Sequence, residues 1–115
     1  MKENVIVSKS FAFSVKIVNL HRYLSQNKKE YVISRKIYKS GTSIGANIHE
    51  ANYAYSRAEF VSKMQIALKE CYETEYWLTL FSRANVIEED KIKTLYNQCG
   101  TLRRILVASI NTAKK

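Results

Sequence analysis

Two of the three glycines in this 115-residue chain, Gly41 and Gly45, lie one helical turn apart in a segment whose apolar spacing predicts a helix. A glycine inside a helix costs about 1 kcal/mol relative to alanine. The usual compensation is the close approach of a neighbouring backbone, because glycine leaves free the space that a side chain would fill. The pair therefore predicts a tight helix crossing. The chain has no proline, which favours long uninterrupted helices over loops and edge strands.

Apolar residues recur at helical spacing in four long segments, separated by short polar stretches. We expect the first helix over residues 8–26, with Ser8 as its N-cap, and the second over residues 32–54. The third extends from residue 56 to about residue 84, and residues 85–89 connect it to the fourth. This pattern predicts one all-α domain, an up-down-up-down four-helix bundle over residues 1–115. The residues expected to face the core are Phe13, Ile17, Leu20, Leu24, Ile33, Ile37, Ile44, Ile48, Ala51, Phe60, Met64, Ala67, Cys71, Leu78, Ile92, Leu95, Cys99, Leu102, Leu106, Ser109 and Ala113.

The clearest local signal is Ser56-Arg-Ala-Glu59, which matches the capping box at the start of a helix. Ser56 is expected to accept a hydrogen bond from an unpaired amide of the first turn. Glu59 is expected to reach back to the cap residue. The third helix should therefore begin at this point.

No motif for enzymatic, metal or cofactor chemistry is found. Cys71 and Cys99 lie on apolar helical faces and are expected to be buried free thiols. A ferritin-type di-iron site needs Glu-x-x-His motifs, but neither His21 nor His49 follows a glutamate by three residues. The segment 41–45 lacks the Lys-Ser/Thr ending and the preceding strand of a P-loop. We therefore expect a protein that is not an enzyme and needs no metal or cofactor.

Polar residues interrupt the apolar faces of the second and third helices. Paired carboxylates at such positions can share a proton in acid–base catalysis, but no nucleophile accompanies them in a recognisable pattern. We expect instead an inter-helix network in which Lys69 or Asn47 satisfies Glu50 or Glu73, and which sets helix register and partner choice. The residues of this network are Asn47, Glu50, Lys69, Glu70 and Glu73, and Glu75 lies beside them.

The formal net charge of +9 is uneven along the chain. Residues 1–57 hold ten Lys and Arg against three Asp and Glu, whereas the remainder holds nine against seven. A positive half on a single domain is typical of proteins with a polyanionic partner. We expect its cations to form one continuous surface near an end of the bundle, which would neutralise phosphates without reading bases. The alternative is a solvated face. The candidate nucleic-acid-binding residues are Lys9, Lys16, Arg22, Lys28, Lys29, Arg35, Lys36 and Lys39.

Four tyrosines lie near these cations in sequence. They would either stack on unpaired bases or pack at helix ends. The tyrosines are Tyr31, Tyr38, Tyr53 and Tyr55.

Two helices carry more apolar surface than a solitary bundle can bury. A bundle helix needs one apolar stripe, yet the first and third helices each have additional apolar residues. Left in water, this surface would favour aggregation, so the sequence predicts homo-oligomerisation, with a closed ring as the usual outcome. The additional residues are Phe11, Val15 and Val18 in the first helix, and Tyr72, Tyr76, Trp77, Leu80 and Phe81 in the third.

A cytoplasmic location is expected. No apolar run approaches the roughly 18 residues that a membrane-spanning helix needs. The first residues lack the long apolar core and small-residue cleavage site of a secretory signal.

The segments 40–51, 56–60 and 69–78 resemble the bacterial four-helix bundle proteins encoded in 23S rRNA intervening sequences. The resemblance extends over nearly the whole chain. It implies a four-helix protomer assembled into a homopentameric ring. It also implies kinship with the accessory proteins of diversity-generating retroelements, which are basic pentamers associated with nucleic acid and a reverse transcriptase. The positions that match the family motif are Ser40, Gly41, Ser43, Ile44, Asn47, Glu50, Ala51, Lys69, Glu70, Glu73, Thr74, Trp77 and Leu78.

Together these features predict a non-catalytic homo-oligomer that associates with RNA or DNA through a basic surface. A reverse transcriptase is a candidate protein partner, and no membrane partner is expected. The alternative is a protein-interaction scaffold with no nucleic-acid role.

Overall fold

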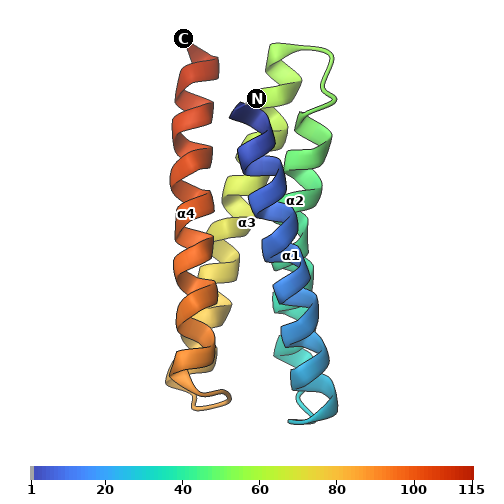
Figure 1. The fold of residues 1–115 in the computed structure, drawn as a ribbon, viewed down its shortest axis with the longest axis vertical. Coiled ribbons are helices and arrows are strands. Elements are labelled where there is room, and N and C mark those ends of the chain that lie inside the picture. The colour runs from blue at the N-terminus through green and yellow to red at the C-terminus, as the bar shows by residue number, and fades with distance from the viewer. Residues whose placement is uncertain (1) are drawn as a thin grey trace.

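Residues 2–115, the part of the chain that the structure describes, form four antiparallel helices packed side by side (Figure 1). The structure is a computed structural model, and it describes side chains from residue 5 onward. The helices are α1 (Lys2–Gln26), α2 (Val32–Ala51), α3 (Arg57–Arg83) and α4 (Glu89–Lys114). Each helix contacts two neighbours, so α1 and α3 lie on one diagonal of the bundle. The predicted all-α four-helix fold is confirmed.

The first helix begins earlier than predicted. α1 includes Ser8, which lies inside the helix instead of capping it. The buried stripe extends about two turns before Phe13, the first predicted core residue, to Ile6. Serine is a common N-cap, but the additional helical residues are stabilised by packing, and tertiary contacts override the local cap preference.

A carboxylate from the preceding turn caps α2. Glu30 accepts hydrogen bonds from the backbone amides of Ser34 at 2.9 Å and Ile33 at 3.3 Å. A negative charge at this position also interacts favourably with the positive end of the helix dipole. The helix ends at Ala51 instead of residue 54, because the amides of Tyr53 and Ala54 form tight-turn hydrogen bonds three residues back along the chain.

Local sequence signals bound α3 at both ends. The Glu59 amide donates to Ser56 Oγ at 3.0 Å, as the capping box predicts. The Glu59 carboxylate accepts from the amide of Tyr55 at 3.4 Å, one residue before the expected partner. At the other end Asn85 adopts a left-handed conformation with φ of 59°, and the Val86 amide donates to the Phe81 carbonyl. This arrangement is a Schellman motif, which satisfies the last carbonyls of the helix.

The core follows the predicted apolar stripes, with exceptions at the helix ends. Ile33, Phe60, Ser109 and Ala113 are only half-buried, while Ile110 is buried without having been predicted. Cys71 and Cys99 are buried free thiols, as expected. A hydrogen bond with Cys71 and burial raise the pKa of the Cys99 thiol, which therefore stays protonated. Other buried residues that were not predicted to face the core are Ile6, Ser10, Ser34, Ser40, Gly41, Thr74, Phe81, Ile87 and Gly100.

The tight crossing predicted from the glycines lies between α1 and α2. A Cβ on Gly41 would come within 2.8 Å of the Ile17 side chain. A Cβ on Gly45 would lie 2.9 Å from Ser14 Oγ and 3.3 Å from the Ser10 carbonyl oxygen. At Gly45 the neighbouring backbone itself comes close, whereas at Gly41 the close neighbour is the buried side chain of Ile17.

Much of the additional apolar surface is exposed in the single chain. Phe11 is 70% exposed on α1, and Tyr72 and Tyr76 are 53% and 61% exposed on α3. Phe81, in contrast, is fully buried, and Trp77 and Leu80 are half-buried. The exposed apolar surface lies on the outward faces of two helices at opposite corners of the bundle.

Candidate nucleic-acid interface

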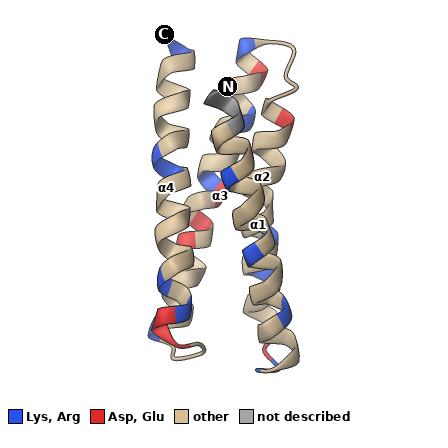
Figure 2. Cartoon of the chain, in the orientation of Figure 1, with Lys and Arg blue, Asp and Glu red and all other residues tan. Residues whose placement is uncertain are grey.

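All eight candidate cations are exposed, and all lie on one helical hairpin: each is on α1, on α2 or in the turn between them (Figure 2). Among the described side chains of residues 5–51 there are two carboxylates, Glu30 and Glu50. Glu30 caps α2, and Glu50 forms an ion pair with Lys63 at 2.7 Å. Neither carboxylate neutralises the candidate cations.

The sequence predicted that these cations would form one surface near an end of the bundle. The structure does not gather them there. Lys9 lies 17 residues before the end of α1, which corresponds to roughly 25 Å along the helix axis. Lys9 and Lys16 face α4, where they line a groove with α4 residues. Lys36 lies instead toward α3, with its ammonium 5.9 Å from the centre of the Trp77 ring. Rotation around the helix axes thus divides the cations between different faces.

The turn between α1 and α2 holds the cations that are adjacent in sequence. Lys28 and Lys29 are exposed there, and Lys29 adopts a left-handed conformation with φ of 56°. Arg22 lies one turn before the end of α1 and contacts Asn19 Oδ1 at 3.5 Å. Arg35 is exposed in the first turn of α2.

The cations on the α3 side of α2 have acidic neighbours. Burial and the charge of Glu73 raise the pKa of Glu70. The charges of Lys69 and Lys39 lower it and so partly offset this rise. Lys39 therefore lies near a carboxylate of α3, whereas no carboxylate lines the groove that Lys9 and Lys16 border.

The four tyrosines do not form a common stacking platform. Tyr31 lies at the α1–α2 turn, while Tyr53 and Tyr55 lie at the α2–α3 turn at the opposite end of the bundle (Figure 1). Tyr38 packs against the imidazole of His21, with ring centres 4.7 Å apart. Tyr55, at 92% exposed, is the most exposed of the four.

The predicted polar network is not formed with the expected partners. Glu50 pairs with Lys63 instead of Asn47 or Lys69, and its pKa is lowered by the hydrogen bond and the charge of this lysine. Asn47 donates to the Ser43 carbonyl of its own helix. Glu73 accepts from Trp77 Nε1 at 3.2 Å, also within one helix.

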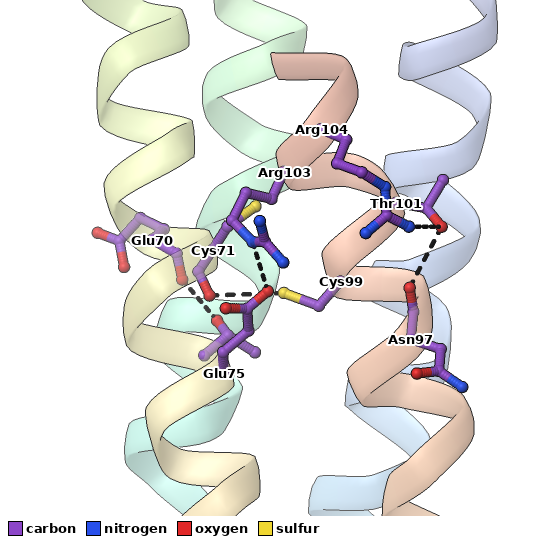
Figure 3. A network of polar contacts seen from close by, with 9 residues as sticks. Glu70, Cys71, Glu75, Asn97, Cys99, Thr101, Arg103 and Arg104 are labelled. Carbon is purple, nitrogen blue, oxygen red and sulfur yellow. Dashed lines mark hydrogen bonds and ion pairs between the residues drawn. The ribbon is translucent and has the colours of Figure 1, made fainter. Parts of the chain in front are cut away.

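The inter-helix polar contacts that do form involve other residues. Thr74 and Ser40, both buried, join α3 to α2 through a hydroxyl–hydroxyl hydrogen bond of 3.0 Å. Arg103 Nε donates to Glu75 Oε2 at 2.8 Å and joins α4 to α3 (Figure 3). These pairs are 34 and 28 residues apart in sequence, so no local pattern could have identified them.

Among the described residues no group of three His, Cys, Asp or Glu side chains could hold a metal ion. The described helices also contain no stretch that is both long and apolar enough to cross a lipid bilayer.

Residues 2–108 match the model of the 23S rRNA-intervening sequence protein family. The chain belongs to this family. This family member is similar to a solved structure from Bacteroides thetaiotaomicron VPI-5482, with 47% sequence identity. That structure is described as a protein with unknown function from the S23 ribosomal protein family. The match covers 96% of this chain and 99% of the other, with a TM-score of 0.94. No curated protein matches the chain. The family resemblance seen in the sequence is confirmed.

Proposed function

We propose that this member of the 23S rRNA-intervening sequence protein family is a non-catalytic cytoplasmic homo-oligomer that associates with RNA through the cations of the α1–α2 hairpin. One observation carries the proposal: eight exposed cations lie on this hairpin, and the two carboxylates described there are engaged elsewhere. Unpaired cations attract phosphates and release the counterions that surround a nucleic acid, which favours binding at low salt.

Self-association is proposed from the exposed apolar residues. Phe11 on α1 and Tyr76 on α3 lie on helices at opposite corners of the bundle, so different surfaces would meet when copies associate. A contact between two different surfaces is heterologous, and it closes into a ring when the rotation between copies allows. The pentamer implied by the family resemblance is such a ring. It would repeat the basic hairpin around an axis and multiply weak phosphate contacts.

The second candidate is a protein-interaction scaffold. The positions of Lys39 near the Glu70 carboxylate and of Lys36 over the Trp77 ring favour it, because cations already engaged by neighbouring groups contribute less to phosphate binding. In this case a protein such as a reverse transcriptase would be the partner, and the positive charge would serve solubility.

The test is the affinity for a structured RNA, measured by fluorescence anisotropy across a salt series. We expect the logarithm of the binding constant to fall linearly with the logarithm of the salt concentration, and binding to be lost when the eight hairpin cations are replaced with Gln. The control replaces exposed cations of the other hairpin, and circular dichroism checks that each variant remains helical. No binding by the wild-type protein at low salt, or equal binding by all variants, would support the scaffold instead. The control positions are Arg57, Lys69, Arg83, Lys91, Lys93, Lys114 and Lys115.

A further inference from the structure

A groove of about 240 Å³ runs between α1 and α4, on the side of α1 that faces away from α2. These two helices make the least extensive contact of the neighbouring pairs, which leaves the groove open. Its floor is apolar, formed by the buried side chains of Phe13 and Leu102. The other residues that line it are Lys9, Ala12, Lys16, Gln98 and Thr101.

The rim of the groove is positively charged. Lys9 and Lys16 are seven residues apart, which places their Cα atoms about 10 Å apart on one side of α1. Arg104 of α4 places a third cation next to the groove, since its Nη2 donates at 3.3 Å to Oγ1 of Thr101, a residue that lines the groove (Figure 3). Within the described part of the chain no Asp or Glu lines the groove.

Other cations of the bundle differ in this respect. Lys63 pairs with Glu50, and Arg103 pairs with Glu75. Lys39 lies close enough to Glu70 to influence its pKa. The groove therefore carries positive charge that the described side chains leave uncompensated. An anion bound there would supply the compensating negative charge.

The side chain of Gln98 lacks a partner in the same groove. Its Oε1 atom is buried and makes no hydrogen bond within the described residues. A buried acceptor left unpaired is unfavourable relative to a bonded one. Gln98 itself is only half-buried, so rotation of its flexible side chain can bring the amide to the groove opening. There Oε1 would accept a hydrogen bond from a hydroxyl group.

We infer that the α1–α4 groove binds the sugar–phosphate backbone of RNA. Lys9, Lys16 and Arg104 hold phosphate oxygens, and Gln98 Oε1 accepts a hydrogen bond from a ribose 2′-hydroxyl. That hydroxyl is the group by which a protein distinguishes RNA from DNA. The inference rests on the proposed RNA association and goes beyond it by locating the site and predicting a preference for RNA over DNA. It is compatible with assembly, since Phe11 and the groove lie on different sides of α1.

The test compares single-stranded RNA and DNA of one sequence, titrated with the full chain across a salt series. In the double variant K9Q/K16Q we expect RNA affinity to fall on the order of tenfold, and the salt slope to decrease by about 0.7 for each lysine. The matched control K36Q/K39Q removes the same charge from exposed positions on the α3 side of α2, and it should change both quantities less. Circular dichroism establishes that both variants are folded.

Gln98 is tested by its effect on selectivity. The substitution Gln98→Leu preserves size and removes the orphaned oxygen, so the protein should remain folded. We expect RNA affinity to fall by roughly 2- to 10-fold, the effect of one hydrogen bond, with DNA affinity unchanged. An unchanged ratio of RNA to DNA affinity would overturn the role of Gln98.

The outcomes separate the inference from the function on which it rests. RNA binding that K9Q/K16Q and K36Q/K39Q weaken equally would overturn the groove and leave RNA association intact. Absence of RNA binding by the wild-type protein at low salt would overturn both.

Discussion

Gly41 occupies a position where any side chain would collide with Ile17. Three Ile17 atoms lie within 2.9 Å of the place where a Cβ would stand, and Ile17 is fully buried. Gly100 is different, because its nearest neighbours are the flexible guanidinium groups of Arg103 and Arg104, both at 3.4 Å. Two glycines inside helices of one chain thus have opposite consequences.

Gly41→Ala is therefore expected to destabilise the protein, and Gly100→Ala to stabilise it. Overpacking at Gly41 costs about 1–3 kcal/mol, and improved helix propensity offsets about 1 kcal/mol of this. At Gly100 only the propensity gain remains. Urea denaturation at one fixed protein concentration measures both, because assembly makes apparent stability depend on concentration. Equal stabilisation by the two substitutions would show that α1 and α2 do not cross tightly. Adding Ile17→Ala should relieve the Gly41→Ala defect.

At the scale of elements, the helix ends differ in how they are satisfied. Glu30 accepts two amide hydrogen bonds at the start of α2, whereas Glu88 precedes α4 without making a side-chain cap bond. Both carboxylates lie near the positive end of a helix dipole. Glu30 and Glu88 therefore differ in their capping hydrogen bonds and share the interaction with the helix dipole.

We expect Glu30→Ala to destabilise the protein by about 1 kcal/mol, the usual loss for an N-terminal cap. This corresponds to a decrease in melting temperature of about 4 °C for a chain of this size. Glu88→Ala is the matched control, and it should lower the melting temperature less because only the dipole interaction is lost. Thermal unfolding followed by circular dichroism distinguishes them, and equal decreases would contradict the capping role of Glu30.

At the scale of the whole molecule, the bundle leaves apolar side chains on two opposite corners. Phe11 on α1 and Tyr76 on α3 are more than half exposed. A groove of about 440 Å³ lies beside Phe11, over the small residues Gly45 and Ala46 of α2. A second copy of the chain would bury these surfaces, and burial of apolar area is the main driving force of such contacts.

Multi-angle light scattering at micromolar concentration should therefore detect an oligomer for the wild-type protein. Phe11→Ser and Tyr76→Ser should each lower the mean mass, because each removes apolar area from one side of a heterologous contact. Tyr55→Ser is the control, since Tyr55 is highly exposed in a turn at the end of the bundle. A wild-type monomer, or variants that assemble like the wild type, would refute the ring.

Helix number, approximate helix ends and most of the core could be read from the chain, because these depend on residues three and four apart. The capping box at Ser56 is of this kind, and so are the apolar stripes. The start of α1 differs from the prediction, because packing extends the helix past Ser8, a residue that favours a cap. The family resemblance was also readable, since its motif residues are contiguous in three segments.

The grouping of side chains into surfaces required the folded bundle. Contacts such as Lys63–Glu50, Arg103–Glu75 and Thr74–Ser40 join residues 13, 28 and 34 positions apart. Their formation depends on how far each helix is rotated about its axis and which helices are neighbours, and core packing sets both. The same rotation turned Lys9 and Lys16 toward α4 and Lys36 toward α3. Charge is a property of composition, but a binding surface exists only where packing brings charges together.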